Sequence, residues 1–201
     1  MDWRERRLRG KCHPNNPSRR EPACGVPTMK RAMFGLTLAA IALSAGSAAT
    51  WSAQKHPDQD FFKAAAEGGI AEVEAGNLAQ SKGNSAAVKD FGAMMVKDHS
   101  EANARLQSIA ASQGIELPGS SSAMQMASKA KLELLTGDTF DKAYIKNQVT
   151  AHEQTVALLK KEIASGSDPQ AKAFATQILP TVRSHLKKIR EIAAQAGITT
   201  K

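Results

Sequence analysis

Three histidines and one glutamate are the residues of this chain whose types and spacing best suit chemistry: Glu72, His99, His152 and His185. Each lies within three positions, or about 4 Å along the axis, of the middle of a different predicted helix. A four-helix bundle would bring such mid-helix side chains together, and we call these four residues the polar layer. Imidazole and carboxylate ligands suit Zn(II), Fe(II), Mn(II) or Cu(II). The polar layer therefore predicts a site for one divalent metal ion.

Asp98 stands next to His99 and extends this prediction. Its carboxylate is expected either to be a further ligand or to accept a hydrogen bond from a ligand imidazole. The alternative is that the polar layer holds no metal and is satisfied internally, by Gln148, Tyr144 or water. Buried polar groups of that kind can specify how helices pair. The chain would then be a metal-free periplasmic structural or interaction module.

The helices that must position these residues are indicated by apolar periodicity and by capping and stop signals. From residue 58 onward the sequence is rich in Ala, Lys, Gln and Leu, and its Gly and Pro fall mainly at the ends of periodic segments. The predicted helices span 58–83, 84–114, 123–135, 138–166 and 168–197. We therefore expect an all-α fold.

The lengths of the connections predict how the helices are arranged. The turns near residues 83–85 and 166–168 are too short for anything but antiparallel hairpins. The connection between the hairpins, 115–137, is long and carries the short helix. Two antiparallel helical hairpins joined by a long connection are typical of a ferritin-like four-helix bundle. We expect this bundle to form a domain over residues 58–201.

Small residues surround Glu72 at helical spacing. Gly68, Gly69, Ala75 and Gly76 lie on the same stretch of the first long helix. They either leave room around the carboxylate or let the backbone approach a neighbouring helix closely. The sequence leaves both interpretations open.

The region before the bundle predicts export. Residues 29–31 are Met-Lys-Arg, residues 32–45 are small and apolar, and residues 47–49 are small, as in a secretory signal peptide over 29–49 followed by a linker over 50–57. The Arg- and Pro-rich stretch 1–28 shows no periodicity, so we predict that Met29 is the true start and that 1–28 is a mis-assigned extension. The expected location is the periplasm, with peripheral association with the envelope left open.

Charge and cysteine distribution exclude several classes of function. The net charge is +8, but residues 1–49 hold nine Lys/Arg against three Asp/Glu, and residues 50–201 hold eighteen against sixteen. The near balance in the second part argues against a nucleic-acid partner. No apolar run after the signal peptide is long enough to span a membrane. Cys12 and Cys24 both precede Met29, so the mature chain is expected to have neither disulfides nor cysteine-based metal sites.

Motifs of enzymes are absent from the sequence. There is no nucleophile with a base at recognisable spacing, no phosphate-binding loop and no cofactor fingerprint. We therefore expect a protein that is not an enzyme. Its partners are not indicated by any motif.

Several short segments resemble a known family. They are Ala-Ala-Glu-Gly-Gly from Ala65, Asp98-His99, the Gln148 to His152 spacing, Leu179-Pro180 and His185-Leu186. Over about residues 58–197 the chain is similar to the exported bacterial family called domain of unknown function 4142, whose members are described only as predicted outer-membrane proteins. The resemblance implies a ferritin-like helical bundle in the cell envelope. It supplies no established reaction.

The chain departs from di-iron ferritins in one respect. Those proteins use Glu-x-x-His on two helices, whereas Val96, Val149 and Val182 stand three residues before the histidines of the polar layer. This difference disfavours ferroxidase chemistry. The function expected from the sequence is an exported, soluble bundle that binds a metal ion in envelope metal handling or stress response.

Overall fold

Five α-helices make up the regular structure of residues 56–200, the part of the chain that the computed structural model describes. They are α1 (Gln59–Lys82), α2 (Ala86–Ser112), α3 (Ala123–Glu133), α4 (Gly137–Ser165) and α5 (Pro169–Gln195). Strands are absent from these residues, so the all-α prediction is confirmed. The expected signal peptide, the extension before it and most of the linker lie outside the described residues.

The helix ends follow the signals in the sequence. Ser85, Ser122 and Asp168 precede α2, α3 and α5, and each accepts a hydrogen bond from the backbone N–H three residues further on. Gly114 and Gly197 follow α2 and α5 with φ of 67° and 64°, a left-handed conformation that glycine adopts without steric cost. Local residue chemistry therefore sets where these helices begin and end.

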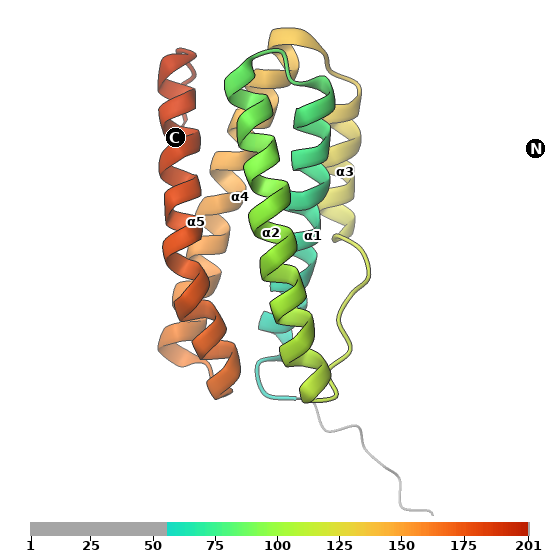
Figure 1. Cartoon of the computed structure of the whole chain (residues 1–201), viewed down its shortest axis with the longest axis vertical. Helices are drawn as coiled ribbons and strands as arrows, with labels where there is room; N and C mark the ends of the chain where they lie inside the picture. Colours follow the sequence, from blue (N-terminus) through green and yellow to red (C-terminus); the bar gives the residue numbers. More distant parts are fainter. Residues whose placement is uncertain (1–55, 201) are drawn as a thin grey trace, which may run out of the picture. The chain divides into compact units, whose positions relative to one another are not determined.

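The long helices pair as two hairpins, α1 with α2 and α4 with α5 (Figure 1). In the first hairpin the backbones approach closely at Gly76 and Gly92. A Cβ atom at Gly76 would lie 2.6 Å from the carbonyl oxygen of Gly92, and one at Gly92 would lie 2.7 Å from that of Gly76. Gly76 therefore serves close packing of α1 on α2, the second of the two interpretations of these small residues.

Two carboxylates join the hairpins at opposite ends of the bundle. Asp58, just before α1, accepts hydrogen bonds from the backbone N–H groups of 167–168, at 2.6 and 2.5 Å. Asp141, the fifth residue of α4, accepts them from the N–H groups of 84–85, both at 2.8 Å. The start of α1 therefore lies beside the end of α4, and the end of α1 lies beside the start of α4. The two helices are antiparallel. It follows that α2 and α4 run in the same direction (Figure 1).

The connection from α2 to α4 returns along the outside of the bundle. It carries α3, which packs against α1 and α4. At the end of α3 the Lys82 ammonium donates a hydrogen bond to the Glu133 carbonyl oxygen, and along its length Asn147 donates one to Ser128 at 3.2 Å. None of the helices in the described region is long and apolar enough to cross a membrane.

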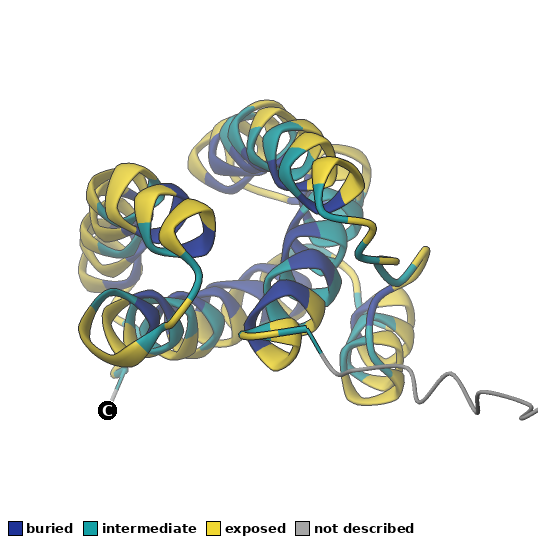
Figure 2. Ribbon diagram, turned by 90° about the horizontal axis from the view of Figure 1, so that it is seen from below, coloured by how far each residue is buried: buried dark blue, intermediate teal, exposed yellow. Residues whose placement is uncertain are grey.

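The buried side chains form two apolar clusters, one toward each end of the four long helices. One is built around Phe91 and Tyr144, and the other around Phe62 and Phe174. Figure 2, which looks along the bundle, shows the buried residues on the helix faces that are turned toward one another. The residues of the polar layer lie in the middle of their helices, between the two clusters.

Candidate metal centre

Three helices bring the histidines of the polar layer together. The ring centroids of His99 on α2, His152 on α4 and His185 on α5 are 5.5 to 5.8 Å apart. One ring nitrogen of each lies within 4.8 Å of the others. The three side chains are buried, with exposed fractions of 8%, 1% and 2%. We call these three residues the histidine cluster.

His152 is oriented by the backbone of its own helix. Its Nδ1 lies 2.9 Å from the carbonyl oxygen of Gln148, one turn earlier in α4. A carbonyl oxygen only accepts hydrogen bonds, so Nδ1 carries the proton and Nε2 presents a lone pair. The apolar side of the ring meets Phe91, whose centroid is 6.0 Å away.

His185 is oriented by a carboxylate on a neighbouring helix. Its Nε2 lies 2.9 Å from Oδ2 of Asp98 on α2. A carboxylate accepts this hydrogen bond, so Nε2 carries the proton and Nδ1 presents a lone pair. Asp98 was expected to be either a further ligand or an acceptor for an imidazole N–H. This contact fits the second role.

Three ring nitrogens, one on each histidine, have no protein partner among residues 56–200. They are His99 Nε2, His152 Nε2 and His185 Nδ1. The pKa of His99 is lowered to about 3. Burial is the largest cause, and the neighbouring imidazoles of His152 and His185 add to it. Burial also lowers the pKa of His185, although the hydrogen bond to Asp98 opposes this change. Both shifts favour the neutral imidazole, the form that binds metals.

Glu72 lies on the other side of His152. Its Oε1 is 3.9 Å from His152 Nδ1, the nitrogen that points away from the unpartnered Nε2. Burial raises the pKa of Glu72, and the nearby His152 and the Gln148 side chain partly oppose this change. The structure thus brings Glu72 beside the histidine cluster, but outside the group of nitrogens that lie within 4.8 Å of one another.

A small contraction would give the three nitrogens the spacing that a metal ion requires. Zinc–nitrogen bonds of about 2.0–2.1 Å in a tetrahedral site place the nitrogens about 3.3 Å apart. The ring nitrogens are within 4.8 Å, so side-chain movements of roughly 1 Å would suffice. Three nitrogen ligands leave a further coordination position open, as in sites where metal-bound water is replaced by another ligand.

The valines that replace the glutamates of di-iron motifs have a structural role. Val149 and Val182 are buried, one in each apolar cluster. The methyl group of Val96 lies next to Gly76, where α1 and α2 are closest. A carboxylate at Val149 or Val182 would be placed in an apolar cluster.

Sequence reasoning missed a second buried carboxyl group, Glu162 near the end of α4. It is 6% exposed, and its Oε1 has no hydrogen-bond partner in the described region. Burial, and then the charge of Asp58, raise the pKa of Glu162 to about 7. Its spacing of three residues from buried Leu159 was the available signal, because that spacing places both on one face of the helix.

Comparison with known proteins places the chain in a family. Residues 42–192 match the family described as Domain of unknown function (DUF4142). The chain belongs to this family. The match includes the whole polar layer and Asp98, and it confirms the resemblance seen in the sequence. Among curated proteins, none matches the chain.

Two solved structures of DUF305 proteins share the fold. A fragment from Deinococcus radiodurans superposes with a TM-score of 0.61 at 12% identity, covering 69% of this chain and 95% of that one. A protein from Streptomyces coelicolor gives 0.58 at 15% identity, with 72% and 97% covered. At these identities the likeness extends to the helical fold alone.

Proposed function

We propose that this DUF4142 protein is an exported helical bundle that binds one divalent metal ion through His99, His152 and His185. The observation that carries the proposal is that three buried imidazoles lie together. One ring nitrogen of each is within 4.8 Å of the others, and each ring has a nitrogen without a partner in the described chain. Left without partners, such groups cost about 1–3 kcal/mol each. A metal ion would satisfy all three at once.

The hydrogen bonds on the far sides of the rings support the same proposal. Metal-bound histidines usually donate their other ring N–H to a carboxylate or a backbone carbonyl. His185 does so to Asp98, and His152 to Gln148. Asp98 then acts as an orienting acceptor, and Glu72 lies beside His152 without being a direct ligand. The ion is Zn(II), Fe(II), Mn(II) or Cu(II), all of which accept imidazole.

The setting we propose is the periplasm, in envelope metal handling or stress response. The signal peptide expected over 29–49 and the even charge balance of residues 50–201 support this setting. The parallel directions of α2 and α4 and the long connection through α3 support a ferritin-like arrangement. The absence of Glu-x-x-His supports a mononuclear site without ferroxidase activity.

Metal content after export tests this proposal. Residues 29–201 would be exported, purified without chelator or metal-affinity resin, and measured by mass spectrometry. The wild type is expected to hold close to one ion per chain, and a His99→Ala, His152→Ala, His185→Ala variant none. His56→Ala is the matched control, because His56 lies before α1 and outside the histidine cluster. Circular dichroism would verify that each variant is folded.

A metal-free module is the second candidate. It is favoured by the edge-to-face contact of His152 with Phe91 and by the Asp98–His185 hydrogen bond, which could hold helices in register without an ion. Absence of metal from the wild type, even after incubation with zinc, iron, manganese and copper, would establish this candidate and exclude the first. Under the metal proposal, saturation at 100 times Kd should stabilise the fold by about 2.7 kcal/mol.

A further inference from the structure

The two hairpins of the bundle differ in charge. Residues 56–114, which include α1 and α2, hold five Lys/Arg against eight Asp/Glu. Residues 137–200, which include α4 and α5, hold nine Lys/Arg against six Asp/Glu, and two of those carboxyl groups, Asp141 and Glu162, are buried. The even charge balance of the described chain is therefore the sum of an acidic hairpin and a basic one.

The cations of α4 lie along its border with α5. Four exposed or half-exposed residues follow one another at intervals of four, seven and seven, which keeps them on one line along a helix: Lys142, Lys146, Glu153 and Lys160. Glu153 accepts a hydrogen bond from Arg190 of α5 at 2.5 Å, and 38% and 52% of the two side chains are exposed. This contact places the line at the solvent-exposed edge where α4 meets α5.

The second helix continues this surface. Arg183, Lys187 and Arg190 are exposed and are separated by four and three residues along α5. Lys187 is 82% exposed and lies 4.0 Å from Glu191. We call the six cations of the two helices the basic face: Lys142, Lys146, Lys160, Arg183, Lys187 and Arg190. The carboxylates paired with them are Glu153 and Glu191.

Stability of the fold does not account for this arrangement. Lys142 and Lys146 are like charges at i and i+4 of one helix, and so are Arg183 and Lys187. Like charges at this spacing destabilise a helix. The gathering of cations thus acts against folding, and we infer that it serves binding.

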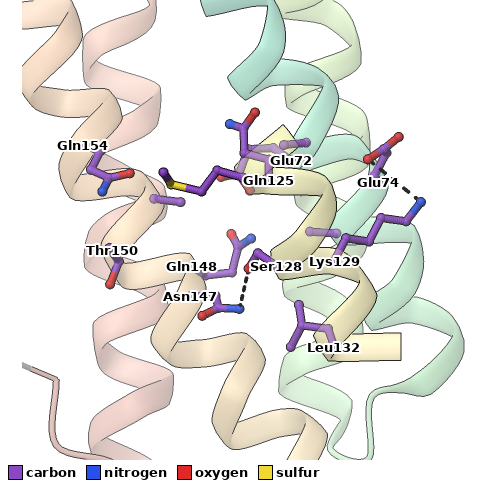
Figure 3. Close-up of a pocket in the computed structure, with 14 residues that line it drawn as sticks. Glu72, Glu74, Gln125, Ser128, Lys129, Leu132, Asn147, Gln148, Thr150 and Gln154 are labelled. Atoms are coloured by element: carbon purple, nitrogen blue, oxygen red, sulfur yellow. Dashed lines mark hydrogen bonds and ion pairs between the residues drawn. The ribbon is translucent and has the colours of Figure 1, made fainter. Parts of the chain in front are cut away.

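The protein itself leaves the basic face uncovered. The opposite side of α4 faces α3, over a pocket lined by α1, α3 and α4, and there Asn147 donates a hydrogen bond to Ser128 (Figure 3). On the side of the basic face, α4 and α5 lie next to one another and run antiparallel (Figure 1). Helices of 29 and 27 residues give this side a length of about 40 Å. An extended partner can therefore contact both helices at once.

The chemistry of the face indicates a partner that carries phosphate groups. Lysine and arginine bind phosphate through charge-assisted hydrogen bonds, and clusters of them are attracted to the surface of anionic membranes. A broad face made by two helices suits a plane of many headgroups better than one small anion. We propose that the α4–α5 hairpin docks through the basic face on a membrane surface that contains anionic phospholipids.

Nucleic acid fits this face less well. Proteins that bind single strands stack the bases on aromatic side chains, but every Phe and Tyr among residues 56–200 is buried. Proteins that read duplex DNA place one helix or a strand ribbon in a groove. The basic face is instead shared by two helices that lie side by side, so a flat partner matches it better.

Co-sedimentation of the exported protein with vesicles tests the proposal. The probes are vesicles of phosphatidylcholine alone and vesicles of equal parts phosphatidylglycerol and phosphatidylcholine. We expect binding to the second kind to be at least about tenfold tighter, because phosphatidylglycerol carries a net negative charge. Raising the ionic strength from about 0.01 M to about 0.15 M shortens the Debye length from about 30 Å to about 8 Å and should weaken this binding.

A charge-reversal variant shows whether the basic face is responsible. Lys146→Glu, Lys160→Glu, Arg183→Glu changes three of its cations and leaves the ion pairs of Lys187 and Arg190 in place. Binding to the anionic vesicles should weaken at least about tenfold. Circular dichroism would verify that the variant is folded.

The matched control is Lys63→Glu, Lys89→Glu, Lys131→Glu, which reverses three exposed cations on α1, α2 and α3 and reaches the same net charge. It should keep most of the binding, and the His99→Ala, His185→Ala variant should bind like the wild type, because the docking does not depend on the metal function. Equal binding to both kinds of vesicle, equal loss in the two charge-reversal variants, or tighter binding to duplex DNA than to the anionic vesicles would each overturn the proposal.

Discussion

A single carboxylate decides which nitrogen His185 offers to the centre of the bundle. Oδ2 of Asp98 accepts a hydrogen bond from Nε2 at 2.9 Å, so the proton lies on Nε2 and Nδ1 has the free lone pair. The side chain of Asp98 is 27% exposed, while that of His185 is 3% exposed, so the contact links the buried cluster to the surface. Orienting partners of this kind tune metal affinity through ring position and basicity.

Asp98→Ala is therefore expected to lower metal affinity about 10- to 100-fold without abolishing binding. The ring of His185 would lose its orientation, while the three ligand nitrogens would remain. Competition against a chromophoric chelator would measure the affinity. Asp90→Ala removes an exposed carboxylate from the same helix and should leave the affinity unchanged. A similar loss in both variants would mean that general charge, and not orientation, is responsible.

At the scale of the elements, the packing of α1 on α2 depends on where each glycine faces. Gly76 meets the backbone of α2, whereas a Cβ atom at Gly68 would find its nearest neighbour 3.9 Å away, at the Gln125 side chain. Backbone atoms cannot move aside as a flexible side chain can. Glycines eight residues apart in one helix thus have opposite tolerance for a methyl group.

Gly76→Ala should destabilise the protein by about 1–3 kcal/mol, because the added methyl group overpacks the hairpin. Gly68→Ala should instead stabilise it by roughly 0.5–1 kcal/mol, because alanine favours the helix and finds room. Urea unfolding of the two variants beside the wild type would measure both changes. Destabilisation by Gly68→Ala of the same size as by Gly76→Ala would contradict the close approach at Gly76.

On the scale of the whole molecule, Asp58 and Asp141 connect the two hairpins at opposite ends. Asp58 also faces Glu162, and two carboxyl groups in contact favour keeping one of them protonated. Burial and the charge of Asp58 hold the pKa of Glu162 at about 7, above its ordinary value of 4.5. One end of the bundle therefore contains a proton that the unfolded chain releases more easily.

The folded state binds this proton more tightly than the unfolded state, so stability should fall as the pH rises from about 4.5 to about 7. The contribution of Glu162 is on the order of 1–3 kcal/mol, complete below this range and lost above it. Glu162→Gln should remove most of this pH dependence. Thermal unfolding of both metal-free proteins at several pH values would measure it. Parallel curves for variant and wild type would show that other groups are responsible.

The sequence by itself determined the elements and the level of the site along them. Capping residues such as Ser85 and Asp168 act within one turn, so the helix ends could be predicted from local chemistry. The rise per residue of a helix is fixed, so His99, His152 and His185 could be assigned to one level before their contacts were known.

Only the tertiary structure decided how these side chains face one another. Helix rotation and side-chain rotamers depend on neighbours that are distant in sequence. For that reason the sequence could not predict that Glu72 lies on the Nδ1 side of His152, or that Asp98 takes the hydrogen bond of His185 Nε2. Nor could it predict that Glu162 lies beside Asp58. The same packing forms the pocket that Glu72 helps to line, because its walls come from α1, α3 and α4.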